Sequence, residues 1–337
     1  MTTPDTSPLR LGFPVKVTAR PDLKSNDTRR WKNDPHLSVS LDYMDAILDH
    51  CAARGIRMYR MSSDLAPYAT HPDMPQFHSM VEDSADRLAE IGAKARALDV
   101  RLSFHPSQFV LLNAPDPDLV AKSVKDLASQ ARMLDLMGCG PESVLVTHVG
   151  GVYDDKTAAR ERWCAAWDGL PPHVRRRLVL ENDDLRFSAT DTLWISERTG
   201  VSLIFDHQHW WCLHEPEEDL IPTFAACLAT WADGVRPKMH FSSPRTEMRT
   251  ITRKDRKTGK PVVTTAPPIW TGHADYIQPF EFIRFMRDAE DLTFDVMLEA
   301  KMKDAALERL RLDLARYAPD VAARFGLESA EARVAAE

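Results

Sequence analysis

The chain has 337 residues, of which 44% are hydrophobic and 28% charged, and this composition is typical of a soluble globular protein rather than a disordered one. With 43 basic and 50 acidic residues the formal net charge is −7, which taken alone counts against a general nucleic-acid binder, because phosphate binding needs clustered lysine and arginine. The sequence has no run of about 18 apolar residues, so no membrane-spanning helix is expected.

The N-terminus and the cysteines both indicate a compartment. Residues 1–10 carry proline and aspartate where a secretory signal would need an apolar core. The five cysteines are scattered and form no CxxC pair, which is typical of a reducing environment. We therefore expect a cytoplasmic protein.

Short β-branched or aliphatic runs alternate with longer segments of helical periodicity. The eight predicted strands are Leu11–Val17, Ile56–Ser62, Val100–His105, Val144–His148, Leu178–Asn182, Ser202–Asp206, Lys238–Ser242 and Thr293–Glu299. Helical spacing is clear in Leu41–Ala53, Met80–Leu98, Leu119–Met137 and Ile277–Arg287. Eight such units predict an α/β fold, a (β/α)8 TIM barrel. A doubly wound open sheet is the alternative, although no glycine-rich fingerprint follows the first strand.

The same alternation predicts a single barrel domain over residues 11–319. An N-terminal extension, 1–10, precedes it, and a helical tail, 320–337, follows it. Two long polar stretches interrupt the rhythm, 18–37 after the first strand and 244–272 after the seventh. We expect the second stretch to be an insertion into the barrel.

This insertion is strongly basic. It alternates in hydrophobicity and turns at Thr258–Gly259, which predicts a β-hairpin. Residues 244–260 hold seven basic and two acidic side chains, so DNA could bind locally despite the negative net charge. A solvated hairpin and an arm that grips phosphates are both open interpretations. The candidate DNA contacts in the hairpin are Arg249, Arg253, Lys254 and Lys257.

Polar side chains gather near the carboxyl ends of the predicted strands, where TIM barrels hold their active-site residues. They are His71, His105, His148, Glu181, Asp206, His209, Lys238, His240 and Glu299, with His273 in a later loop. Any one of them could be a cap or a surface group, but burying so many imidazoles and three carboxylates is costly unless they are paired or bind metal. Imidazole and carboxylate sets suit Zn, Mn or Fe. The pattern predicts a multinuclear metal site and favours phosphodiester hydrolysis.

Several sequence strings, taken together, resemble the UV damage endonuclease family. They are MSSDLAPYATH (61–71), FHPSQFVLLNAP (104–115), LDLMG (134–138), HVGGVYDDK (148–156), LENDD (180–184), DHQHWW (206–211), KMHFSS (238–243), GHADYI (272–277) and LEAKMKD (298–304). The resemblance runs in the family's order over roughly residues 11–315. It implies a xylose-isomerase-like TIM barrel that nicks duplex DNA 5′ to UV photoproducts and other lesions.

The resemblance also implies a role for each matching residue. The implied ligands of one ion are His105, His148 and the bridging Glu181, those of a second are Glu181, Asp206, His240 and Glu299, and His209 and His273 serve a third, with His71 as a further ligand. These two or three divalent ions are commonly Mn²⁺ in the family, with Zn²⁺, Mg²⁺ or Co²⁺ as alternatives. The implied catalytic residues are Glu181, Lys238 and His240. Lys238 matches a family lysine that can be carboxylated.

Lesion contacts are implied near the first and third strands. Gln108 and Phe109 match the pair that wedges into the duplex, and an aromatic wedge suits this task because unstacking a base costs a few kcal/mol. Core packing is the alternative for Phe109. Phe13 and Val17 stand where the family has a tyrosine and an asparagine, so Phe13 is a candidate lesion contact that lacks the hydroxyl group. The expected partner is damaged double-stranded DNA. The protein is expected to be a monomer, and no membrane partner is expected.

Two other functions remain as alternatives. A paralogue that keeps the metal barrel but acts on a small molecule, as a sugar-type isomerase or an oxidase, is favoured by the altered first strand and the acidic net charge. A non-catalytic binding module is disfavoured because every implied ligand position holds a metal-binding residue type. A positive groove beside the metals would support the endonuclease, and a closed acidic cup would support the paralogue.

Overall fold

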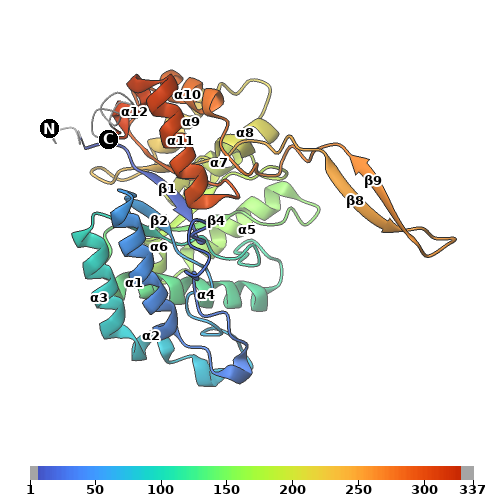
Figure 1. Ribbon diagram of the computed structural model, residues 1–337. Coiled ribbons are helices and arrows are strands. Elements are labelled where there is room, and N and C mark those ends of the chain that lie inside the picture. The colour runs from blue at the N-terminus through green and yellow to red at the C-terminus, as the bar shows by residue number, and fades with distance from the viewer. Residues whose placement is uncertain (1–6, 328–337) are drawn as a thin grey trace.

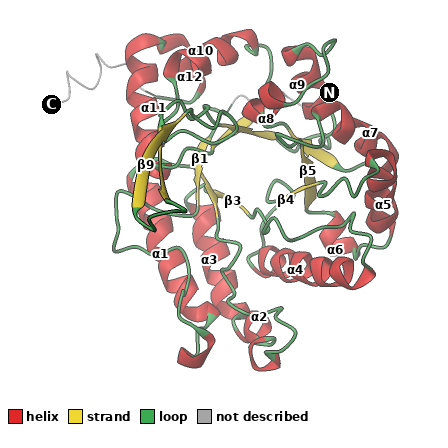
Figure 2. Ribbon diagram, turned by 90° about the vertical axis from the view of Figure 1, so that its right-hand side faces the viewer, coloured by secondary structure: helices red, strands yellow, loops and turns green. Residues whose placement is uncertain are grey.

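A ring of parallel strands forms the centre of the molecule (Figures 1 and 2). The computed structural model describes residues 7–327. Its eight parallel strands are β1 (Leu11–Pro14), β2 (Met58–Arg60), β3 (Arg101–Ser103), β4 (Leu145–His148), β5 (Leu178–Glu181), β6 (Ser202–Ile204), β7 (Lys238–Phe241) and β10 (Asp295–Leu298). Each lies within a predicted strand but is shorter. The predicted α/β barrel is confirmed.

The ring closes through two narrow contacts. Hydrogen bonding orders the strands as β3-β2-β1-β10-β7 in one sheet and β4-β5-β6 in another. A single parallel bridge between Phe104 and Leu145 joins β3 to β4, and one between Asp206 and His240 joins β6 to β7. The second bridge includes a hydrogen bond of 3.0 Å from His240 N to Phe205 O. The strands therefore surround an interior, and the open-sheet alternative is wrong.

Helices cover the outside of this ring, as Figure 2 shows. They are α1 (Leu37–Ala53), α2 (Met80–Asp83), α3 (Ala85–Ala97), α4 (Pro117–Leu136), α5 (Lys156–Asp168), α6 (Pro172–Arg175), α7 (Ala189–Thr199), α8 (His207–Cys212), α9 (Leu220–Leu228), α10 (Pro279–Asp288), α11 (Lys303–Tyr317) and α12 (Pro319–Arg324). The main core lies between strands and helices, where Phe241 of β7 packs on Phe282 and Phe285 of α10. Within residues 7–327, none of these helices is long and apolar enough to cross a membrane.

The strand and helix boundaries differ in places from the sequence prediction. The first strand ends at Pro14 rather than Val17, because Val15 adopts a left-handed backbone with φ 65° and turns the chain away. The predicted helix Met80–Leu98 is split into α2 and α3 by the non-helical backbone of Ser84. The start of the predicted tail forms α12, whereas residues 1–6 and 328–337 lie outside the described part of the chain.

The predicted hairpin is confirmed and projects away from the barrel (Figure 1). Strands β8 (Arg249–Lys254) and β9 (Pro261–Ala266) pair antiparallel over their whole length. At the turn, Asp255 Oδ1 accepts hydrogen bonds from the backbone N–H groups of Lys257 and Thr258 at 3.0 and 2.7 Å. Gly259 supplies the left-handed residue that this turn requires, with φ 68°. The turn thus comes where the sequence predicts it.

Arginine side chains fasten the amino-terminal end of the barrel, away from the strand ends that carry the histidines. Asp295, the first residue of β10, is completely buried and accepts a hydrogen bond of 2.9 Å from the guanidinium group of Arg101 in β3. Its other oxygen accepts from the backbone N–H of Arg10 at 2.9 Å. Buried charges are tolerated when they are paired in this way.

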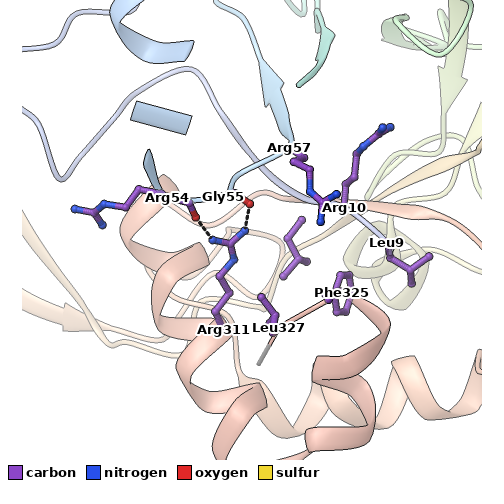
Figure 3. Close-up of a pocket in the computed structure, with 10 residues that line it drawn as sticks. Leu9, Arg10, Arg54, Gly55, Arg57, Arg311, Phe325 and Leu327 are labelled. Carbon is purple, nitrogen blue, oxygen red and sulfur yellow. Dashed lines mark hydrogen bonds between the residues drawn. The ribbon is translucent and has the colours of Figure 1, made fainter. Parts of the chain in front are cut away.

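A pocket of about 290 Å³ opens at this same end (Figure 3). Arg311 of α11 lies beside it and donates to the backbone carbonyls of Arg54 and Gly55 at 2.6 and 2.8 Å. Leu9 and Phe325 form part of the apolar wall. These contacts hold α11 against the turn after α1. Arg311 therefore has a structural role at this end of the barrel.

Candidate metal centre

Seven of the predicted ligands converge at the carboxyl ends of β3 to β7 and β10. They form three overlapping groups, His105–His148–Glu181, Glu181–Asp206–His209 and Asp206–His240–Glu299. Within each group, one potential ligand atom from every residue lies within 4.8 Å of the others. Because Glu181 belongs to two groups and Asp206 to two, the three groups make one continuous cluster.

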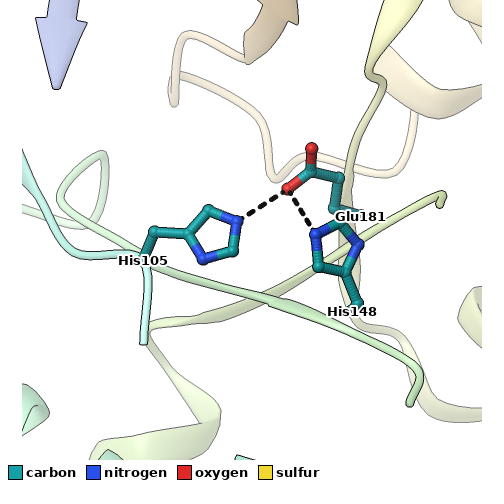
Figure 4. A group of neighbouring side chains, drawn as sticks. All are labelled: His105, His148 and Glu181. Carbon is teal, nitrogen blue, oxygen red and sulfur yellow. Dashed lines mark hydrogen bonds and ion pairs between the residues drawn. The ribbon is translucent and has the colours of Figure 1, made fainter. Parts of the chain in front are cut away.

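Glu181, the last residue of β5, is the centre of this cluster (Figure 4). Its Oε2 atom lies 3.2 Å from His105 Nε2 and 3.7 Å from His148 Nε2. Its Oε1 atom lies 2.9 Å from His240 Nδ1 and 3.6 Å from His209 Nδ1. The carboxylate is 1% exposed and faces four imidazoles from four different strand ends. This arrangement fits a carboxylate that bridges two ions.

Glu299 follows β10 and forms the other side of the cluster. Its Oε1 atom lies 3.3 Å from His240 Nδ1 and is ion-paired with the guanidinium group of Arg60. Its Oε2 atom lies 3.7 Å from His273 Nδ1, and the backbone carbonyl of Glu299 is 2.8 Å from the same nitrogen. His273 therefore borders the cluster next to Glu299, although it belongs to none of the three groups.

The cluster favours the ionised form of two of its three carboxylates and disfavours that of the third. Burial raises the pKa of Glu181, but His240 and His148 outweigh it and bring the pKa well below its usual value. Burial likewise opposes ionisation of Glu299, where Arg60 and His240 hold the pKa well below its usual value. For Asp206 burial prevails and the pKa is raised. A site that stabilises carboxylate anions with imidazoles is suited to divalent cations.

Orphaned polar atoms test whether the residues fit metal ions. Asp206 Oδ2, His148 Nδ1 and His240 Nε2 are buried and have no hydrogen-bond partner in the part of the chain that the structure describes. Buried polar atoms in proteins nearly always have a partner, so several orphans in one cluster indicate a ligand. Neutral imidazole nitrogens and carboxylate oxygens are donors that Mn²⁺, Zn²⁺ and Fe²⁺ accept. The residues present therefore fit divalent metal ions.

Neighbouring backbone and amide groups fix the ligands in place. Asn182 joins the ends of β5 and β6, since its Oδ1 accepts from Asp206 N at 2.8 Å and its Nδ2 donates to Asp206 O at 3.1 Å. Asp206 in turn caps α8 by accepting from His209 N at 2.8 Å. Burial opposes a proton on His209, but the carboxylates of Asp206 and Glu181 raise its pKa to about 9. Such outer contacts orient ligands for a metal.

The structure does not bring His71 into the cluster. His71 follows β2 and lines a separate cavity of about 600 Å³ together with Tyr68, Arg29 and Lys122. Its Nδ1 accepts a hydrogen bond of 3.2 Å from the backbone N–H of Asp73. A local turn thus uses one ring nitrogen, Nδ1, and His71 belongs to none of the three ligand groups among residues 7–327.

Lys238 lies inside the barrel below the ligands and is fully buried. Its Nζ atom donates to Ser103 Oγ at 3.0 Å, and no carboxylate is its ion-pair partner among residues 7–327. Burial lowers the pKa of Lys238 well below its usual value, and the nearby Arg101 and Arg60 lower it further. The neutral amine is thereby favoured, which is the nucleophilic form of lysine.

The loop after β3 forms the rim of a cleft beside the cluster. A cavity of about 670 Å³ lies between this loop and the loops after β4 and β5, and His105, His148 and His209 face it. Gln108 is exposed at its edge, and the Phe109 ring is 72% exposed. Core packing of Phe109, the alternative interpretation, is wrong.

Phe13 has the opposite environment. Its side chain is 0% exposed, and its ring lies 5.3 Å from that of Tyr59 in the core. Contact with a DNA lesion, as implied by the resemblance, is wrong for this residue because the ring is covered by the protein. Val17 is also buried.

Sequence reasoning missed Arg60 as a member of the site. It ends β2 with 12% of its side chain exposed and pairs with Glu299. A charged residue at the end of a buried strand is the available signal, although arginine is not a metal ligand and so does not match the ligand pattern. Its charge helps to keep Glu299 ionised.

Comparison with known proteins gives the same assignment along most of the chain. The model of the family described as UV-endonuclease UvdE matches residues 37–324. A UV DNA damage endonuclease of Bacillus velezensis is 34% identical over 289 residues, which are 84% of this chain and 83% of that protein. A UV DNA damage endonuclease of Bacillus cereus is 33% identical over 80% of this chain and 79% of its own length.

Solved structures are similar in fold. The crystal structure of SacUVDE matches with a TM-score of 0.74 and 28% identity, covering 91% of this chain and 98% of that one. A putative sugar phosphate isomerase/epimerase from Anabaena variabilis matches with a TM-score of 0.53 and 11% identity over 90% and 88% of the two chains, which shows the barrel fold alone. From the family match and the two Bacillus relatives, the chain belongs to the UV-endonuclease UvdE family.

Proposed function

We propose that this chain is a metal-dependent DNA-repair endonuclease that nicks duplex DNA 5′ to UV photoproducts and other lesions. The observation that carries the proposal is the buried Glu181 carboxylate, which faces four imidazoles and connects two groups of potential metal ligands. Membership of the UvdE family and the names of the Bacillus relatives support the DNA substrate.

Two or three divalent ions, Mn²⁺ as the first choice, would supply the chemistry by polarising the phosphodiester, lowering the pKa of water and stabilising the departing oxygen. The protein contributes Glu181 and Glu299, whose low pKa values favour the negative charge that balances the cations. His240, placed between these two carboxylates, keeps them in position. We assign the catalytic role to Glu181, His240 and Lys238.

Lys238 has a further consequence for the site. A neutral amine attacks carbon dioxide, and loss of one proton then leaves a carbamate with a negative charge. The low pKa of Lys238 favours the amine that this step requires. Carboxylation of Lys238 would add an anionic ligand at the base of the cluster, where Ser103 holds the side chain.

DNA would bind over the mouth of the barrel, as damaged duplex bound by one monomer. The open cleft beside Phe109 and the projecting hairpin suit a large, elongated substrate better than a small sugar. On the hairpin, Arg253, Lys254 and Lys257 are exposed and available to phosphates, and Arg249 lies at its base.

A plasmid-nicking assay tests this function directly. We expect purified protein loaded with Mn²⁺ to convert UV-irradiated supercoiled plasmid to the nicked form, to leave unirradiated plasmid intact, and to lose the activity after chelation. Restoring Mn²⁺ should restore nicking. Metal content measured on the same preparation is the control, and loaded protein that leaves irradiated plasmid intact would contradict the proposal.

Phe109→Ala should separate lesion opening from metal binding. Because the exposed ring would replace a stacked base, its loss should lower kcat/KM on irradiated duplex by about 10- to 100-fold, which corresponds to the few kcal/mol that unstacking costs. Metal content should not change. Phe280→Ala is the matched control, since Phe280 is 57% exposed on α10, and equal losses in both variants would exclude a wedge.

A further inference from the structure

Three cations stand on adjacent loops of the barrel, and two of them, Arg60 and Lys303, lie near Glu299. Lys16 follows β1, Arg60 ends β2, and Lys303 begins α11 just after β10. These strands are neighbours in the sheet, in the order β2-β1-β10. The three loops are therefore side by side at the mouth of the barrel, on the Glu299 side of the metal cluster.

Hydrogen bonds fix these loops to one another. The backbone N–H of Val15 donates to Arg60 O at 2.8 Å, which holds the first loop against the end of β2. Thr18 Oγ1 donates to Met302 O at 2.7 Å, and this contact holds the same loop against the segment before α11. The positions of the cations are thus set by the barrel rather than by flexible surface chain.

The charges in this cluster are not balanced by the protein. Arg60 is paired with Glu299, and the other nearby carboxylate, that of Asp304, accepts hydrogen bonds from Thr18 and lies 3.2 Å from His50 Nε2. Lys303 is half-buried, yet within residues 7–327 its ammonium group has no hydrogen bond and no ion-pair partner. Burial lowers the pKa of Lys303, and Arg60 lowers it further, whereas Glu299 raises it. A partly buried cation without a partner is costly unless an anion joins it.

We propose that Lys303, Arg60 and Lys16 form a subsite for a DNA phosphate beside the metal cluster. The proposal rests on the function proposed above and names the part of the site that holds the strand to be cut. Arginine presents a planar set of donors and lysine a point charge, and both are phosphate ligands. A phosphodiester held here lies next to Glu299 and His240, so the subsite would set the register of the strand over the metal ligands.

Charge compensation of Glu299 is the competing explanation, and the direct ion pair with Arg60 already provides it. Lys303 also occupies a left-handed backbone position with φ 49°, an unusual conformation for lysine. Glutamine and lysine carry a similar penalty in this left-handed conformation, so a Lys303→Gln variant should keep the backbone as it is. The substitution therefore removes the charge with little other change.

The test compares the salt dependence of duplex binding in wild type and Lys303→Gln. With a labelled duplex that carries one UV lesion, the slope of log Kd against log salt should fall in magnitude by about 0.9, the contribution of one phosphate contact. Taken to 0.1 M salt from a 1 M reference, this slope corresponds to about eightfold weaker binding. Metal content and Tm should equal those of wild type.

Two further variants make the result specific. Lys301→Gln removes an exposed lysine from the same segment and should leave the slope unchanged, whereas Lys303→Arg should restore it. An unchanged slope in Lys303→Gln, or equal losses at positions 301 and 303, overturns the subsite. Different results would contradict the subsite and the proposed function. Wild-type protein that does not nick irradiated DNA contradicts the function, while the slope of its duplex binding still decides the role of Lys303.

Discussion

Glu181→Gln is expected to remove both metal binding and nicking. The amide keeps the shape of the side chain but loses the negative charge that four imidazoles face, so it cannot serve two ions. We expect the metal content to fall by at least one ion per chain and nicking of irradiated plasmid to fall by about a thousandfold or more, which is about 4 kcal/mol in the barrier. Elemental analysis and the plasmid assay on one preparation measure both effects.

Glu142→Gln provides the matched control. Glu142 precedes β4 at the amino-terminal end of the barrel, so the same chemical change there should leave metal content and rate at wild-type values. If Glu181→Gln kept the full metal content and the wild-type rate, Glu181 would not be a bridging ligand. If the variant kept its metal but lost its activity, Glu181 would act in the reaction without being required for metal binding.

Of the substitutions proposed here, Asp295→Asn is expected to lower the free energy of unfolding the most. Its carboxylate is completely buried, bonded to the Arg101 guanidinium at 2.9 Å, with Arg10 and Arg236 nitrogens at 3.6 and 3.7 Å. Without the anion, the buried Arg101 keeps its charge and loses its ion-pair partner, while its hydrogen bonds to the carbonyls of Glu142 and Arg236 remain. Removing one member of a buried pair costs about 3–5 kcal/mol, so the denaturation midpoint should fall accordingly at constant m-value.

The control for this variant is another aspartate that pairs with Arg10. Asp99 also pairs with Arg10, at 2.6 Å, but is 56% exposed. Exposed pairs contribute about 0–1 kcal/mol, so Asp99→Asn should change the free energy of unfolding very little. A comparable, small effect at both positions would show that Asp295 is not needed to balance the buried Arg101.

Local sequence patterns predicted the barrel and most of its site for a common reason. Short buried strands read as aliphatic runs, and the polar residue that ends each run must lie at one face of a parallel ring. His148 and Glu181 are the last residues of their strands, and His240 lies within the last two residues of its own. The periodicity therefore carried positional information about the metal cluster without any knowledge of distances.

Features that depend on loop geometry were not predictable in the same way. A single left-handed residue, Val15, ends the first strand early, and Phe13 is buried against Tyr59 instead of reaching the mouth. His71 sits in a loop whose turn uses its Nδ1, and this loop does not enter the cluster. Arg60 became part of the site only through its contact with Glu299, which lies 239 residues away in the chain.

The two sheets of the barrel meet between β6 and β7 through one bridge, and its residues, Asp206 and His240, are themselves candidate metal ligands. An ion bound to both side chains would cross-link β6 and β7, which are otherwise joined by a single bridge. The scaffold and the reaction would then depend on the same bonds, because occupancy of the centre is coupled to the integrity of the ring. Removing the metal from such an enzyme would therefore abolish activity and weaken the closure of the barrel at the same time.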